Sequence, residues 1–210
     1  MSDQMLKKIA FVLATFAFAE PAFAHHLMGG HQATTFGQGL LSGLGHPVIG
    51  VDHFAAVVAI GCLASAQRSG VISVIGYIVA MMCGVALHLM GTTVPAAELL
   101  VALSVLFLGA IVVWRRDMAV GAALTLFALV GLIHGYALGE SIYGAERTPL
   151  VAYLIGLAVI QSVVALGAMT ICKAAMKRSD PVLVRLIGAG VAGVGIAVLV
   201  QQIIPAPPGG

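Results

Sequence analysis

The segment "GLGHPVIGVDHFAA", residues 43–56, places two histidines and one aspartate in a stretch that is otherwise apolar. His46, Asp52 and His53 supply imidazole nitrogens and a carboxylate, the ligand mixture that suits divalent first-row metals such as nickel, cobalt, zinc and iron. The same groups can also activate a metal-bound water molecule. The segment therefore predicts a metal site, which serves binding or, as an alternative, catalysis.

Four more ionisable residues lie in or beside long apolar runs, namely His88, Glu98, His134 and Glu140. Charged side chains cost about 2.5–3.5 kcal/mol at membrane depth, so they normally face a protein interior or an aqueous cavity. Two of them also have a structural interpretation, His88 as a packing residue near a helix end and Glu98 as a carboxylate favoured by the helix dipole. The functional interpretation predicts that all seven residues line one vestibule.

The spacing of the first two histidines limits how they can act together. On an unbroken helix His46 and His53 lie two turns, about 10.5 Å, apart, too far to share one ion through bonds of about 2.1 Å. Pro47 disfavours helical geometry at His46, and Gly50 loosens the backbone after it. We therefore predict that the first helix begins at Pro47 or is broken there, so that His46 folds back over the site. Alternatively, Asp52 orients His53 from outside the ligand set.

The composition identifies the class of protein that must position these residues. Of 210 residues, 60% are hydrophobic and only 9% are charged, which is typical of an integral membrane protein. We predict an all-α fold with six transmembrane helices, at about 47–66, 71–90, 96–114, 119–139, 149–172 and 183–204. The sequence has no P-loop for ATP, and its net charge of +2 gives no indication of nucleic-acid binding.

The N-terminus has the layout of a cleavable signal peptide over residues 1–24, with Lys7 and Lys8 before an apolar core and small residues at Ala22 and Ala24. An uncleaved first helix is the alternative. After cleavage, the mature chain has three regions. These are a periplasmic His/Gly-rich segment at 25–45, a six-helix transmembrane domain at 46–204 and a periplasmic tail at 205–210.

The start of the mature chain, "HHLMGGHQ", contains His25, His26 and His31. Short histidine-rich tracts bind metal ions, so these residues are a second candidate metal site. A disordered tail is the alternative, because terminal segments are mobile by default.

The basic residues of the loops predict the orientation of the helices. One side of the six-helix arrangement holds Arg68, Arg115, Arg116, Lys173, Lys177, Arg178 and Arg185, whereas the other holds Arg147. Because positive charge accumulates on the cytoplasmic side, both mature termini are expected in the periplasm of a bacterial inner membrane. All seven ionisable residues of the predicted vestibule then lie in the outer half.

The three cysteines, Cys62, Cys83 and Cys172, all fall inside apolar runs. An odd number at scattered positions gives neither a disulfide framework nor a paired metal motif. We interpret them as small packing residues.

Three segments together resemble the HupE/UreJ family of membrane proteins, which are found with nickel hydrogenases and ureases. They are "HPVIGVDHFAAVVAIG" at 46–61, "VPAAELLVALSVLFLGA" at 94–110 and "FALVGLIHGYALGE" at 127–140. The most specific part is the HPxxGxDH motif. The resemblance implies roles in metal handling for His46, Asp52, His53, Glu98, His134 and Glu140. One departure is Gln161, which stands where many relatives carry a further histidine in the fifth span.

The resemblance implies a nickel, sometimes cobalt, permease. Our hypothesis is therefore non-ATP uptake of Ni²⁺ or Co²⁺, with the ion as transported ligand, no permanently bound cofactor and no enzymatic activity. One alternative is a membrane metal-binding protein that passes the ion to hydrogenase or urease maturation partners. Another is an intramembrane metalloenzyme, for which the sequence lacks an HExxH pair.

Overall fold

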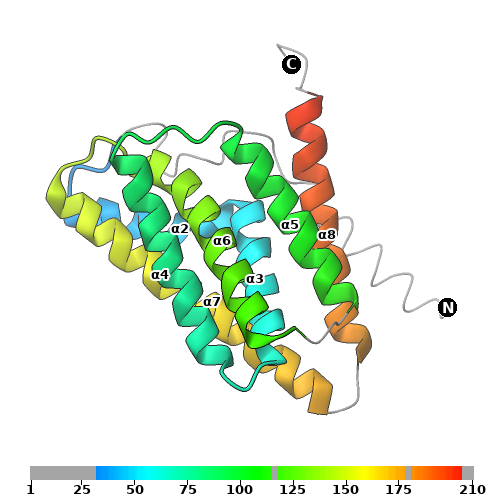
Figure 1. Ribbon diagram of the computed structural model, residues 1–210. Helices are drawn as coiled ribbons and strands as arrows, with labels where there is room; N and C mark the ends of the chain where they lie inside the picture. Colours follow the sequence, from blue (N-terminus) through cyan, green and yellow to red (C-terminus); the bar gives the residue numbers. More distant parts are fainter. Residues whose placement is uncertain (1–31, 115–117, 178–180, 205–210) are drawn as a thin grey trace.

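The computed structural model describes residues 32–114, 118–177 and 181–204, and in these ranges every regular element is helical (Figure 1). The elements are α2 (Phe36–Ile49), α3 (Val51–Ser65), α4 (Gly70–Leu89), α5 (Ala97–Trp114), α6 (Val120–Gly139), the short 3₁₀ helix η2 (Glu140–Ile142), α7 (Arg147–Lys177) and α8 (Pro181–Ile203). The predicted signal peptide and the histidines of the N-terminal segment, His25, His26 and His31, lie outside the described residues.

The helices have the length and composition of membrane spans. Five of them, α4 to α8, are each long and apolar enough to cross a bilayer, and α2 and α3 pass the same test only as a pair. The two helices of this pair meet at an angle of 77°. The protein is therefore an all-helical, multi-pass membrane protein with five to six candidate spans.

The break between α2 and α3 lies at Gly50, which corrects the prediction that the first helix begins or breaks at Pro47. Pro47 instead lies inside the last turn of α2, where it costs only one backbone hydrogen bond. Gly50 takes an extended conformation (φ −69°, ψ 97°), which ends α2 and starts α3. Its N–H still donates to the carbonyl of His46 at 2.9 Å, and its carbonyl accepts from Phe54 at 2.9 Å. Both helix ends are thus satisfied at a sharp corner.

The start of α2 is fixed by a reciprocal pair of side-chain hydrogen bonds. The Thr35 hydroxyl accepts from the backbone N–H of Gln38, and the Gln38 amide oxygen accepts from the N–H of Thr35. This capping box satisfies two amide groups that the first turn of a helix leaves without partners. As a result, α2 begins at Phe36, well before the motif at 46–53.

Three pairs of helices pack closely through glycines: α4 with α6, α5 with α8, and α2 with α7. A methyl group on Gly135 of α6 would collide with the Met81 carbonyl of α4. One on Gly43 of α2 would collide with the Tyr153 carbonyl of α7, and corresponding close approaches join α5 to α8. Small residues at such crossings are the usual means of packing helices in lipid.

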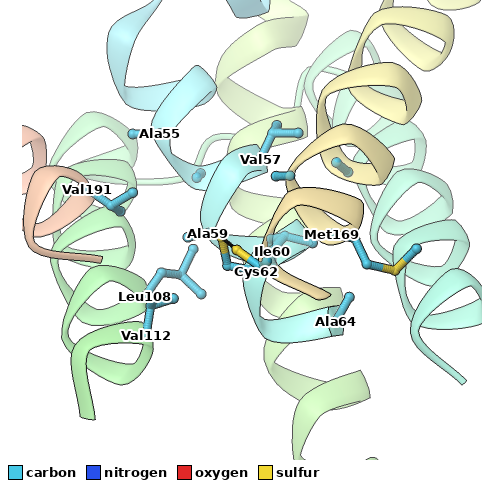
Figure 2. Packing of buried hydrophobic residues seen from close by; sticks show 14 of the residues in the cluster. Ala55, Val57, Ala59, Ile60, Cys62, Ala64, Leu108, Val112, Met169 and Val191 are labelled. Carbon is cyan, nitrogen blue, oxygen red and sulfur yellow. Dashed lines mark hydrogen bonds between the residues drawn. The ribbon is translucent and has the colours of Figure 1, made fainter. Parts of the chain in front are cut away.

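The central helix α3 packs against α5, α7 and α8. Figure 2 shows its apolar residues, among them Ala59, Ile60 and Cys62, within the buried cluster, next to Leu108 of α5 and Met169 of α7. Two cysteines, Cys62 and Cys172, are buried in this cluster, whereas Cys83 is exposed. The packing interpretation therefore fits two of the three cysteines.

The described basic residues separate toward the two ends of the bundle. Helices α3 and α7 end, and α4 and α8 begin, at the lower end in Figure 1. Arg68 follows α3, Lys173 and Lys177 are in the last turns of α7, and Arg185 is in the first turns of α8. Arg147, at the start of α7, lies at the opposite end. The described basic residues therefore lie mostly at one end of the bundle.

Candidate functional site

Two histidines from different helices meet in the protein interior. His53 lies in the first turn of α3, and His134 lies in α6. Their Nδ1 atoms are 2.9 Å apart and their ring centroids 5.0 Å apart. His53 is 4% exposed and His134 is fully buried. At this distance one nitrogen donates a hydrogen and the other accepts it.

Ser104 of α5 contacts the other ring nitrogen of His134. Its hydroxyl donates to the Val101 carbonyl at 2.7 Å and lies 2.8 Å from Nε2 of His134. In the tautomer in which Ser104 donates to Val101, Nε2 of His134 donates to the serine oxygen. Nδ1 of His134 then accepts from Nδ1–H of His53, which places the acceptor lone pair of His53 on Nε2.

The two Nδ1 atoms are close enough to bind one metal ion once the rings turn so that both lone pairs face it. Two ligands bound at right angles through bonds of 2.0–2.1 Å lie about 2.9 Å apart, which matches the present separation of the two Nδ1 atoms. A shift of the His53 hydrogen from Nδ1 to Nε2 would present two Nδ1 lone pairs to one ion. His134 would keep its hydrogen bond to Ser104 throughout. The pair can therefore supply two neutral imidazole ligands.

His46 lies close to this pair because the helix bends. The residue is 6% exposed, and its ring centroid lies 6.3 Å from that of His53. A straight helix would separate the two residues by about 10.5 Å along its axis. The corner at Gly50 therefore brings the first histidine of the motif back toward the second.

The carboxylate of Asp52 contacts the backbone of the first turn of α3. Its Oδ1 accepts from the N–H of His53 at 2.8 Å, and the residue is half-buried. Such a contact satisfies an amide that has no partner within the helix, and the positive end of the helix dipole favours the charge. Asp52 therefore positions the backbone of His53 and places negative charge beside the histidines.

His88 occupies a separate aromatic setting near the end of α4. Its ring centroid lies 4.7 Å from that of Tyr136 and 5.6 Å from that of Tyr143. Its Nδ1 is buried without a hydrogen-bond partner. The Tyr136 hydroxyl donates to the carbonyl of Thr92 at 2.8 Å, which links this cluster to the loop after α4.

The two glutamates of the predicted vestibule are exposed. Glu98, in the first turn of α5, accepts a hydrogen bond from Gln202 near the end of α8 at 2.8 Å. Glu140 caps α6 and begins η2, and its carbonyl accepts from the N–H of Tyr143. Both carboxylates thus lie at the ends of helices, where water or lipid headgroups can solvate them.

The seven predicted residues therefore divide between three places. The structure brings together His46, Asp52, His53 and His134, places His88 with two tyrosines, and leaves Glu98 and Glu140 at the surface. Among the described residues, no three His, Cys, Asp or Glu side chains are grouped closely enough to hold a metal ion. The histidine pair is the closest approach of candidate ligands in this set.

Two polar residues near the motif were not predicted as site residues. Ser104 carried no signal beyond being a hydroxyl in an apolar helix, where serines commonly bond their own backbone. Gln161 of α7 is 1% exposed, and neither its amide nitrogen nor its amide oxygen has a hydrogen-bond partner. It lies beside Pro47 and Val57, which flank the corner between α2 and α3. The departure from the family pattern at Gln161 was the one sequence signal for it.

Comparison with known proteins agrees with the motif. The family model described as HupE / UreJ protein matches residues 13–198. The chain is also similar to Protein HupE of Rhizobium leguminosarum bv. viciae, with 31% identity over 196 residues that cover 92% of this chain and 97% of that protein. No solved structure matches significantly. Both matches extend over nearly all of the chain, and they include the histidine motif at the bent helix. The protein therefore belongs to the HupE/UreJ family.

Proposed function

We propose that this protein takes up a divalent transition-metal ion, nickel in the first instance and cobalt as the alternative, across the bacterial inner membrane without ATP. The observation that carries the proposal is the buried pair of His53 and His134 inside a bundle of helices of transmembrane length. Polar groups at such depth are costly and normally mark a route for substrate. Imidazole nitrogens are ligands that nickel and cobalt accept.

The ion passes from surface groups to the buried pair. His25, His26 and His31 of the N-terminal segment and the exposed Glu98 and Glu140 collect it outside, with His88 beside this approach. His46 and Asp52 then receive it at the corner of the bent helix. There the hydrogen between His53 and His134 moves to Nε2 of His53, and both Nδ1 atoms bind the ion as transported substrate. Ser104 holds His134 in the required tautomer.

The direction of transport is inward. The described basic residues at the ends of α3 and α7 support a cytoplasmic location for that end of the bundle, since positive charge is retained inside. His53 lies in the first turn of α3, at the opposite end of that helix from Arg68. The histidine pair therefore belongs to the outer half, and both mature termini lie in the periplasm.

The membrane potential is large enough to drive uptake. A potential of about 100 mV, negative inside, contributes about 2.3 kcal/mol per charge, hence about 4.6 kcal/mol for a divalent cation. Since about 1.4 kcal/mol corresponds to a factor of ten, this supports roughly three decades of accumulation. The sequence likewise contains no P-loop that would bind ATP.

Proteoliposomes that contain only the purified protein test the proposal. Radiolabelled Ni²⁺ should accumulate inside when a potassium diffusion potential, negative inside, is applied, and should stop accumulating when the potential is collapsed. The variant His53→Ala should abolish accumulation. Ser162→Ala is the matched control, because the Ser162 hydroxyl bonds only to the Ala158 carbonyl of its own helix.

The assay also separates transport from a role in assembly. A protein that only binds the ion and passes it to a hydrogenase or urease maturation partner would retain about one equivalent of nickel, whatever the potential. Binding without accumulation in well-sealed vesicles would reject the uptake proposal and favour that role.

A further inference from the structure

A second chemical site lies in the half of α3 that is remote from the histidines. Cys62, near the end of α3, and Cys172, near the end of α7, have sulfur atoms 2.6 Å apart. The residues are 110 positions apart in the sequence, and both are buried. Two thiols from distant segments are thus in direct contact within the buried cluster.

The close approach follows from how α3 and α7 pack. A methyl group on Gly61 would collide with the Ala165 carbonyl and press on the side chain of Ala168, so the two backbones are in direct contact there. Cys62 follows Gly61, and Cys172 lies one turn beyond Ala168. Figure 2 shows Cys62 at the centre of the buried cluster, between the ribbons of its neighbours.

We infer that Cys62 and Cys172 are a redox-active dithiol, a modification site at which peroxide forms a reversible disulfide between α3 and α7. A disulfide places its sulfurs about 2.05 Å apart, so bond formation requires each thiol to move by only a few tenths of an ångström. The inference concerns a site apart from the histidine pair, and it holds whatever ion the protein handles.

The chemistry balances with hydrogen peroxide as the oxidant. Peroxide first converts one thiol to a sulfenic acid and releases one water molecule. The second sulfur then attacks the sulfenic sulfur, the S–S bond forms, and a second water molecule leaves. In total the two thiols lose two hydrogens and two electrons, and one peroxide becomes two waters. Peroxide is small and uncharged, so it can reach a site in the membrane that larger oxidants cannot.

The reverse reaction uses a cytosolic dithiol. It attacks one sulfur of the disulfide, passes through a mixed disulfide and leaves both cysteines reduced. In the orientation proposed above, the pair lies toward the cytoplasm, where thiols are normally kept reduced. The resting form is therefore the dithiol, and the disulfide accumulates under oxidative stress.

The test uses the unaltered chain in native membranes. Membranes are treated with hydrogen peroxide, remaining thiols are blocked with N-ethylmaleimide under denaturing conditions, and the protein is digested with trypsin without reductant. Trypsin cleaves after Arg68, between the two cysteines, so their peptides stay joined only through a disulfide. We expect a joined peptide that lacks the mass of two hydrogens and that a reductant separates.

Cys83 provides the matched control, because it is exposed and distant in sequence from both partners. The variant Cys83→Ser should give the same joined peptide, and Cys62→Ser should give none. The inference is overturned if Cys62 and Cys172 both still react fully with N-ethylmaleimide after the peroxide treatment. It is also overturned if they join only when the protein is unfolded in detergent before oxidation.

Discussion

Replacing Ser104 by alanine removes the hydroxyl that accepts the Nε2–H of His134 at 2.8 Å. That hydrogen is fully buried, so it would lose its partner without gaining water. An unsatisfied buried donor costs about 1–3 kcal/mol. Loss of a group that orients a metal-binding histidine typically weakens the affinity for the ion about 10–100-fold, or about 1.4–2.8 kcal/mol. The first figure is a loss of fold stability and the second a loss of affinity, so we expect the nickel concentration for half-maximal uptake to rise about 10–100-fold.

The assay is the initial rate of radiolabelled nickel uptake into vesicles over a range of concentrations, normalised to the amount of inserted protein. Ser104→Thr keeps a hydroxyl and should restore most of the affinity. Ser162→Ala removes an equivalent hydroxyl that bonds only within its own helix, and it should leave uptake unchanged. If a fully inserted Ser104→Ala protein had an unchanged half-saturating nickel concentration, the tautomer assignment and the proposed mode of metal binding would be refuted.

Three further predictions address other parts of the protein. Asp52→Asn should reduce nickel uptake about tenfold or more while insertion is unchanged, because the amide can still accept the His53 N–H but carries no charge; unaltered uptake would exclude an electrostatic role. Gln161→Leu should stabilise the protein by about 1–3 kcal/mol, because two buried amide atoms without partners are removed; a lower midpoint of thermal unfolding in detergent would contradict this. Deletion of His25 to His31 should raise the half-saturating nickel concentration, and an identical value would show that the segment does not collect the ion.

The sequence was sufficient to predict the class of fold and the presence of a break in the first span. Hydrophobic runs of about 20 residues identify membrane helices because the bilayer core fixes their length. The proline and glycines around His46 indicated an interrupted helix, but they did not indicate where. The corner falls at Gly50 because a residue with no side chain fits there, whereas Pro47 can be accommodated inside α2.

The contacts of the site were less predictable. These helices are apolar on all sides, so no amphipathic pattern shows which face is turned inward. The sequence placed His53 and His134 in one group of seven residues, and the structure brings these two into contact, but rotation about the helix axis could not be predicted. In the structure Glu98 is exposed and contacts Gln202. Ser104, six positions further along the same helix, instead contacts His134. The packing of α5 against its neighbours decides that Ser104 faces the histidines and Glu98 does not.

The glycine-packed helix pairs restrict how this protein can change shape. Within each pair, backbone lies so close to backbone that the helices cannot slide past one another without collision. Gly61 joins α3 to α7 equally closely, so rearrangement is expected at the helix contacts outside these glycine-packed interfaces. The hydrogen bonds from His134 to His53 and to Ser104 both lie at such contacts, since they join α6 to α3 and to α5. An ion that replaces one of these bonds would therefore change a contact between helices that can move relative to one another.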